Sequence, residues 1–154
     1  MQKITPYLWF DGQAEEAAAY YTSVFKNARI VDVNRMGEAG PAVTVTFEID
    51  GQQFVALNGG PQFAFTEALS LFVSCHDQAE VDELWDRLTE GGGEPGQCGW
   101  LKDRYGVSWQ IIPTALNELM GDPDPEKAGR VVQAMLGMSK IEIKGLRDAY
   151  DGRA

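Results

Sequence analysis

Three apolar segments, at residues 4–10, 69–75 and 107–112, carry the side chains that are most able to do chemistry. We predict that each segment is a β-strand, in which alternate residues lie on one face. The shared faces combine aromatic rings with hydroxyl and amide groups, which is the usual lining of a small-molecule pocket. A buried amide or hydroxyl needs a hydrogen-bond partner, so these polar groups are harder to explain as core filling than the rings are. The predicted ligand-binding residues are Tyr7, Trp9, Ser70, Phe72, Trp100 and Gln110.

The residues give little support to other kinds of site. His76 is the only histidine, so neither a histidine-rich metal site nor a Ser/His/Asp triad is predicted. Cys75 and Cys98 are interpreted as small buried hydrophobic residues. The glycine-rich run at residues 91–96 follows a predicted helix instead of opening one, which indicates a loop and not a phosphate site. The sequence has no glycine-rich strand-to-helix turn suited to a nucleotide or to S-adenosylmethionine.

The stretch from Cys98 to Pro113 predicts the β-hairpin that carries Gln110. Residues 103–106, Asp-Arg-Tyr-Gly, suit a type I turn, because the aspartate accepts backbone N–H groups and the glycine tolerates a positive φ. The strand after the turn places two groups of side chains on opposite faces. These groups are Trp109 and Ile111 on one face, and Ser108, Gln110 and Ile112 on the other.

The elements that must position these residues occur twice in the same order. The first set is a strand ending at Phe10, a helix beginning near Gln13 with Asp11 as its N-cap, and three further strands. The turn Asp50-Gly51 between the last two strands is typical of a two-residue hairpin. The three strands are predicted at residues 29–36, 42–49 and 52–58.

The second set begins with the strand at residues 69–75 and continues with a helix. Asp77 and Glu80 form the pattern of a capping box at the start of this helix. A short strand near residues 96–98 then precedes the hairpin. The repeated order predicts two β-α-β-β-β modules, each with an apolar sheet face that needs a partner.

The C-terminal part differs from both modules. Asp124 is a predicted N-cap with Pro125 at the first helical position, and apolar stripes predict this helix and a short one near residues 143–150. Amphipathic C-terminal helices more often cover the parent domain or a subunit interface than carry chemistry.

Composition limits the class of protein. The 154 residues are enough for one domain with its own core, and two cysteines fit the reducing cytoplasm. The 13 basic and 23 acidic residues give a formal charge of −10, which disfavours a nucleic-acid partner. No apolar run approaches the ~20 residues of a membrane span. We therefore predict a cytoplasmic protein with neither a nucleic-acid nor a membrane partner.

The segments ITPYLWFDGQAEEAAAYYTSVF, LNGGPQFAFTEALSLFVSC and CGWLKDRYGVSWQIIP, with the tail MLGMSKIEIKGL, resemble the PhnB-like family. That family belongs to the vicinal-oxygen-chelate superfamily, with glyoxalase I, bleomycin-resistance proteins and extradiol dioxygenases. The resemblance implies an α+β fold of two glyoxalase-like β-α-β-β-β modules that form a partly open β-barrel with helices outside, plus C-terminal helices. We expect a single domain over 1–154, with modules at about 1–60 and 68–113 and a helical tail at 114–154. Such proteins often carry the label 3-demethylubiquinone-9 3-methyltransferase, but this sequence has no methyl-donor motif.

Enzymes of this superfamily hold a divalent metal with residues from the first and last strands of each module. The resemblance places these positions at Thr5, Ala56, Ser70 and Gln110. The register at Ala56 is left open, with Asn58 nearby. Only Gln110 is of a ligand type seen in such sites, and a catalytic metal centre normally needs three good protein ligands. We therefore predict no tightly bound metal and no cofactor.

Three functional interpretations follow from the resemblance. The preferred one is a metal-free small-molecule-binding protein of the glyoxalase/bleomycin-resistance type, which holds a planar or apolar ligand in the barrel cavity. The alternative is a metal-dependent lyase, isomerase or dioxygenase, and the third is a partner-binding or regulatory dimer with a vestigial cavity. A homodimer is expected in each case, with the modules paired either within one chain or across two copies.

Overall fold

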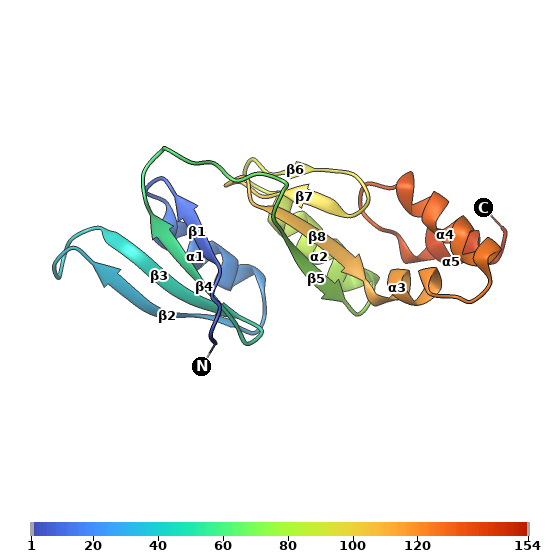
Figure 1. Cartoon of the computed structure of the whole chain (residues 1–154), viewed down its shortest axis with the longest axis horizontal. Helices are drawn as coiled ribbons and strands as arrows, with labels where there is room; N and C mark the ends of the chain where they lie inside the picture. Colours follow the sequence, from blue (N-terminus) through green and yellow to red (C-terminus); the bar gives the residue numbers. More distant parts are fainter. Residues whose placement is uncertain (1, 154) are drawn as a thin grey trace. The chain divides into compact units, whose positions relative to one another are not determined.

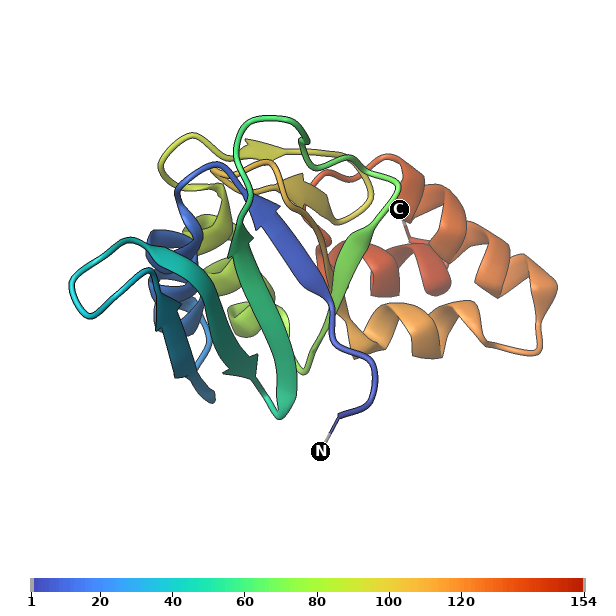
Figure 2. The ribbon, with the colours of Figure 1, turned by 60° about the vertical axis from the view of Figure 1, so that its left-hand side comes forward.

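The chain forms two compact units, Met1–Phe65 and Thr66–Ala154. The computed structural model describes residues 2–153. Within those residues each unit contains one four-stranded sheet with a helix packed on one of its faces (Figures 1 and 2). The predicted α+β class is thereby confirmed, while the partly open barrel stays a prediction.

The first unit holds the first β-α-β-β-β module. Its elements are β1 (Tyr7–Phe10), α1 (Ala14–Val24), β2 (Ala28–Arg35), β3 (Ala42–Ile49) and β4 (Gln52–Asn58). The strand order is β1-β4-β3-β2, with β1 parallel to β4 and the other pairs antiparallel. Asp50 and Gly51 have φ values of 50° and 84°, as a two-residue hairpin of type I′ requires. The bounds predicted for β2, β3 and β4 agree with those of the structure to within one residue.

The core of the first unit lies between α1 and the sheet. The Tyr21 ring of α1 packs on Phe47 with centroids 5.8 Å apart, and Phe47 stacks on Phe54 at 5.3 Å. The predicted N-cap of α1 is wrong, because the helix begins at Ala14 and the backbone N–H of Ala14 donates to Asn58 Oδ1 at 2.8 Å. The end of β4 thus satisfies the first turn of α1.

The second unit repeats the same topology. Its module consists of β5 (Ser70–Cys75), α2 (Gln78–Thr89), β6 (Glu94–Pro95), β7 (Trp100–Lys102) and β8 (Ser108–Pro113). The strand order β5-β8-β7-β6, with β5 parallel to β8, is equivalent to the order in the first unit. The predicted duplication is confirmed.

Two local features of this module test the sequence-based expectations. The capping box is confirmed, because Asp77 Oδ1 accepts from Glu80 N at 2.9 Å and Glu80 Oε1 accepts from His76 N at 2.7 Å. The short strand lies at Glu94–Pro95 instead of residues 96–98, because the chain turns there and Trp100 N donates to Gln97 O at 3.1 Å.

Three helices complete the second unit: α3 (Thr114–Met120), α4 (Pro125–Leu136) and α5 (Ile143–Tyr150). Asp124 caps α4 as predicted, since its Oδ1 accepts from Glu126 N at 2.9 Å, whereas α3 was not expected. The helices share a buried cluster with the end of β8. Its buried members are Ile112, Leu116, Val131, Ile141 and Leu146.

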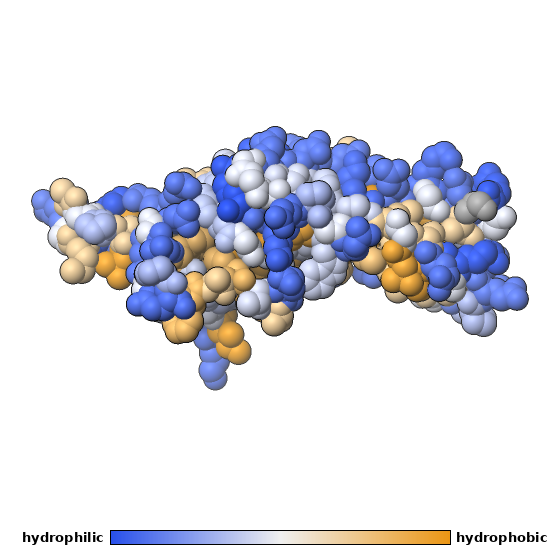
Figure 3. Space-filling view, turned by 90° about the horizontal axis from the view of Figure 1, so that it is seen from above, coloured by the Kyte–Doolittle hydropathy of each residue, from blue (hydrophilic) through white to orange (hydrophobic). Residues whose placement is uncertain are grey.

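The surface mixes polar and apolar side chains. The face seen in Figure 3 is largely hydrophilic, with smaller hydrophobic areas between the polar side chains. Of the helices formed by residues 2–153, none has both the length and the apolar character needed to cross a membrane.

Candidate functional site

The candidate site is one face of the second sheet, formed by neighbouring residues of β5, β8 and β7. Phe72 is in register with Gln110, and Gln110 is in register with Trp100. Residues in register on adjacent strands project from the same face, so the amide stands between two aromatic side chains. α2 packs on the opposite face of this sheet (Figure 1). Strand alternation thus brings together three residues that the sequence predicted as ligand-binding.

A fourth predicted residue fixes the orientation of the amide. Gln110 Nε2 donates a hydrogen bond to Ser70 Oγ at 2.9 Å. Within residues 2–153, the Gln110 Oε1 atom accepts no protein hydrogen bond, so this carbonyl is a free acceptor on the face. An amide held by one hydrogen bond and open at its oxygen is suited to receive an N–H or O–H group from a ligand.

The neighbouring row of the same face contains a hydroxyl group in an unusual state. Ser108 is in register with Ser70 on one side and with Lys102 on the other. Its side chain is only 1% exposed, and among residues 2–153 its Oγ has no hydrogen-bond partner. A buried polar atom without a partner costs about 1–3 kcal/mol, and at this degree of burial a ligand on the face does not reach it.

The positive charge of Lys102 on this face is neutralised by the carboxylate of Glu67. Lys102 Nζ lies 2.7 Å from Glu67 Oε1. The hydrogen bond from Lys102 lowers the pKa of Glu67, and the same bond raises the pKa of Lys102. Both groups are therefore charged at neutral pH and cancel, which favours an uncharged ligand over an anionic one.

The aromatic side chains of the face are accessible. Phe72 is 51% exposed, and Trp100 is half-buried. An exposed ring on a sheet face is rarely needed for the core, whereas it offers area on which a flat ligand can stack. This face therefore combines apolar area with a small number of oriented polar groups.

The remaining two predicted residues, Tyr7 and Trp9, belong to the first unit. They lie on β1, where Tyr7 is 61% exposed. Trp9 is held within its own unit, because its Nε1 donates to Gly60 O at 2.9 Å and its ring meets Phe63 edge-on at 4.9 Å. Gly59 lies against the same ring, which a Cβ at that position would approach to 2.3 Å. Their predicted role as cavity walls stays a prediction.

The four positions expected for a metal differ in what they offer. Ala56 is buried and in register with Leu8 on the side of the sheet that α1 covers, so the register assumed for it is wrong. Thr5 and Ser70 offer only hydroxyl groups, and Gln110 offers a neutral amide. Among residues 2–153, no three histidine, cysteine, aspartate or glutamate side chains lie together as a metal-holding group. This donor set does not fit a divalent transition metal.

Asp103 holds the hairpin that carries Gln110, and the sequence revealed only part of this role. The predicted turn is confirmed, since Asp103 Oδ1 accepts from Tyr105 N at 2.8 Å and Gly106 N donates to Asp103 O at 2.9 Å. Its carboxylate is also 2% exposed and accepts from Val107 N at 3.1 Å and from Trp109 Nε1 at 2.9 Å. It thereby fixes the start of β8, which carries Gln110. In the sequence, the only indication of the bond between Asp103 and Trp109 is that this tryptophan follows six residues after the aspartate.

The two cysteines should differ in reactivity. Cys75 is fully buried, as predicted, and burial raises the pKa of its thiol to about 12. Cys98 was also predicted to be buried, and this is wrong, because it is half-buried. Because only the thiolate reacts, we expect iodoacetamide at pH 8 to modify Cys98 and to spare Cys75 in the folded chain. Peptide mass spectrometry would measure this, with urea-unfolded protein as the control in which both cysteines react. Equal labelling of both in the folded chain would contradict the burial of Cys75.

The sequence and fold of this chain can be compared with those of known proteins. A family profile described as 3-demethylubiquinone-9 3-methyltransferase matches residues 2–112. A PhnB protein from Bacillus cereus is 36% identical with a TM-score of 0.67, over 73% of this chain and 99% of that chain. No match was found among curated proteins.

Two more distant structures share the fold alone. Protein PA1353 from Pseudomonas aeruginosa is 20% identical with a TM-score of 0.63, over 73% of this chain and 98% of that chain. The fosfomycin resistance protein FosX from Listeria monocytogenes is 15% identical with a TM-score of 0.54, over 73% of this chain and 93% of that chain. The two modules therefore have the glyoxalase-like, vicinal-oxygen-chelate fold.

Proposed function

This chain belongs to the 3-demethylubiquinone-9 3-methyltransferase family, and from that premise we propose that it is a small-molecule-binding protein that holds a planar or apolar ligand without a metal. The observation that carries the proposal is the position of Gln110, which lies in register between Phe72 and Trp100. Stacking on each ring contributes about 0.5–1.5 kcal/mol beyond the buried area, and a hydrogen bond to the amide contributes about 0.5–1.5 kcal/mol.

The polar groups of the face narrow the chemistry of the ligand. The free Gln110 Oε1 can accept a hydrogen bond from a ligand. The pairing of Lys102 with Glu67 removes the net positive charge that an anionic ligand would seek. The ligand is therefore a flat, uncharged molecule with an N–H or O–H group.

Methyl transfer, which the description of the family names, is not part of the proposal. A methyl donor of the nucleotide type is held at a glycine-rich turn between a strand and a helix. The two strand-to-helix turns of the modules have the sequences Asp11-Gly12-Gln13 and His76-Asp77, and neither is such a turn. The homodimer and the cytoplasmic location expected from the sequence likewise stay predictions.

Substitution of the aromatic wall should weaken ligand binding more than substitution of the serine. Trp100→Ala removes a stacking ring together with its apolar area, so we expect a loss of about 2 kcal/mol, or roughly 30-fold in Kd. Ser70→Ala removes only the hydrogen bond that orients Gln110, and about 0.5–1 kcal/mol should be lost. A panel of flat, uncharged aromatic compounds, screened by thermal shift and measured by titration calorimetry, provides the test.

Met36→Ala is the matched control for that experiment, because Met36 is an exposed apolar residue of the loop between β2 and β3 and belongs to the first unit. Its Kd should equal that of the wild type. The proposal fails if no compound of the panel binds, or if compounds that bind do so equally well after Trp100→Ala.

A second measurement addresses the metal. Protein purified without a chelator should contain far less than one equivalent of any transition metal, because the donor set of hydroxyls and one amide cannot hold such an ion against buffer. Elemental analysis of wild type and Gln110→Ala measures this. Stoichiometric metal that disappears in Gln110→Ala would favour the metal-dependent enzyme instead.

A further inference from the structure

The segment that joins α4 to α5, residues 138–143 with the first residue of α5 included, is bonded to the loop that leads into β7. Cys98 N donates to Met138 O at 2.7 Å, and Gly99 N donates to Ser139 O at 2.8 Å. We refer to residues 138–143 as the strap. It lies outside residues 2–112, which the family profile matches, so the strap is an addition to the duplicated module.

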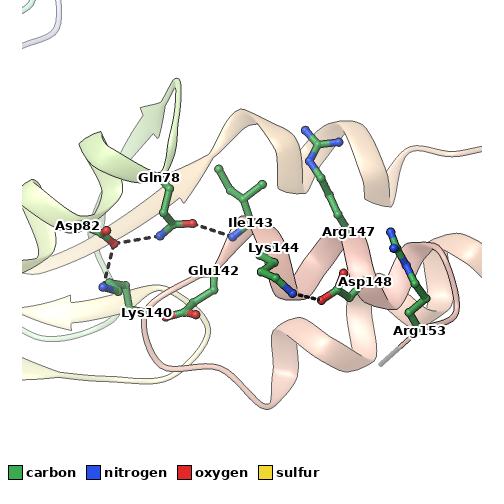
Figure 4. Close-up of a pocket in the computed structure, with 9 residues that line it drawn as sticks. All are labelled: Gln78, Asp82, Lys140, Glu142, Ile143, Lys144, Arg147, Asp148 and Arg153. Carbon is green, nitrogen blue, oxygen red and sulfur yellow. Dashed lines mark hydrogen bonds and ion pairs between the residues drawn. The ribbon is translucent and has the colours of Figure 1, made fainter.

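The strap is also fixed on its other side, to α2 (Figure 4). The Gln78 side chain uses both ends of its amide. Its Nε2 donates to Ile141 O at 3.0 Å, and its Oε1 accepts from Ile143 N at 2.7 Å, which Figure 4 shows as a dashed line. Lys140 Nζ pairs with Asp82 Oδ1 at 2.8 Å. These residues line a groove of about 610 Å³. The strap is therefore held between α2 and the loop before β7.

The loop that the strap contacts has an unfavourable backbone conformation. Cys98 has a φ of +59° and Gly99 a φ of +85°, and the left-handed region is costly for a cysteine. Such a conformation persists only where the surrounding structure imposes it. The backbone hydrogen bonds that Cys98 N and Gly99 N donate to Met138 O and Ser139 O supply that constraint.

Trp100 follows directly after these two residues. Its backbone carbonyl accepts from Gly96 N at 2.8 Å, and Gly96 O in turn accepts from Ser139 Oγ at 2.5 Å. Ile111 N of β8 donates to Gly99 O at 2.8 Å. The turn that precedes Trp100 is thus held by hydrogen bonds to the strap and to β8.

We propose that the strap positions Trp100 on the ligand-binding face, so that the C-terminal helices control the affinity of the site. This inference rests on the proposed function, because it assigns a positioning role to Ser139 and Gly99 at that same face. When the contacts of the strap are lost, Cys98 relaxes out of the left-handed region and the Trp100 ring moves away from its place beside Gln110.

Two variants of the full-length chain weaken the strap in different ways. Ser139→Ala removes the hydroxyl bond to Gly96. Gly99→Ala introduces a Cβ that would lie 2.7 Å from Ile112 Cδ1 and 3.0 Å from Ile141 Cγ1, so it presses on the side chain of Ile112 and on Ile141 of the strap.

Each variant has a matched control in the first unit. Ser23→Ala also removes an exposed hydroxyl that donates to a backbone carbonyl, Tyr20 O, at 2.6 Å. Gly51→Ala adds a methyl group at nearly the same φ, +84°, but into open space. The controls therefore carry the same local changes without touching the strap.

The position of Trp100 can be followed without any ligand. In protein labelled with fluorotryptophan, the fluorine NMR signal of Trp100 is identified by its loss in Trp100→Phe. We expect Ser139→Ala and Gly99→Ala to shift or broaden this signal while the Trp9 signal and both controls stay unchanged. Adding Cys98→Asn to Ser139→Ala should move the signal back towards its wild-type position, because asparagine tolerates the left-handed region.

Binding of the planar apolar dye Nile red gives the second readout. The Kd should rise about threefold to tenfold in the two strap variants, which corresponds to the partial loss of one stacked ring. An unchanged Trp100 signal in both variants would overturn the role of the strap, whatever the dye does. A shifted signal with unchanged dye affinity would show that the strap does not act on the ligand-binding face. The dye is flat and uncharged but has no N–H or O–H group, so failure of the wild type to bind it removes the support for stacking on the aromatic side chains. The fluorine signal then still decides whether the strap positions Trp100.

Discussion

Asp103→Ala is expected to lower the free energy of unfolding by about 3–5 kcal/mol. The substitution takes the acceptor from the backbone N–H groups of Tyr105 and Val107 and from Trp109 Nε1. Val107 and Trp109 are buried, so their N–H groups would lose this acceptor in a place that water does not reach. Each such group costs about 1–3 kcal/mol, and hydrogen bonds to a charged acceptor are at the strong end of the range.

Urea unfolding followed by circular dichroism measures this effect. Asp103→Asn keeps one acceptor oxygen for the turn and should lose about half as much stability as Asp103→Ala. Asp32→Ala, which removes an exposed aspartate from β2, is the control and should change stability by less than about 0.5 kcal/mol. A loss below about 1 kcal/mol for Asp103→Ala would mean that this carboxylate does not hold the hairpin.

Phe47→Ala is expected to be comparably damaging in the first unit, with a loss of about 3–5 kcal/mol. Phe47 is 1% exposed and stacks with both Tyr21 and Phe54, so the substitution opens a cavity between α1 and the sheet. Rigid neighbours on both sides leave the site little freedom to collapse, and the cavity adds to the lost burial.

The same unit provides a matched control for this substitution. Phe63→Ala removes a phenylalanine that is largely exposed and has an edge contact with Trp9, so less than about 1 kcal/mol should be lost. Both variants can be compared by thermal and urea unfolding. Equal losses would show that the α1–sheet interface is not the main source of stability in this unit.

Strands and their order were predictable because their signals are local. Residues 42–49 alternate strictly between apolar and polar residues, and the Asp50-Gly51 turn requires the positive φ values that it adopts. The helix α3 was missed because it begins directly after Pro113 and buries only Ala115 and Leu116, which is too little for a periodic pattern. The strand β6 is two residues long, and its place depends on its pairing with β7.

Long-range hydrogen bonds account for the remaining errors. The amide of Ala14 is satisfied by Asn58, 44 residues further along the chain, so the nearby Asp11 was a reasonable but wrong cap. The register between β1 and β4 places Ala56 on the covered side of the sheet, which no local pattern indicated.

The candidate site was predictable in part for the same reason. Alternation along β8 and β5 correctly placed Gln110 beside Phe72 and Ser70 on one face, because the period of two is built into a strand. The orphaned Ser108 hydroxyl depends on what buries it, and the strap depends on contacts between segments about 40 residues apart. Neither can be read from spacing.

The parallel pairing of the first and last strands in each module has a consequence for synthesis on the ribosome. β1 pairs with residues 55–58, and β5 pairs with residues 108–113. The first strand of each module therefore cannot pair until the last strand has been synthesised. The antiparallel pairs β2–β3 and β3–β4 join segments that are close in sequence and can form as soon as both strands have emerged. Each nascent module therefore exposes its first strand until its final strand has been made, and the interval is longest for the strand that carries Tyr7 and Trp9.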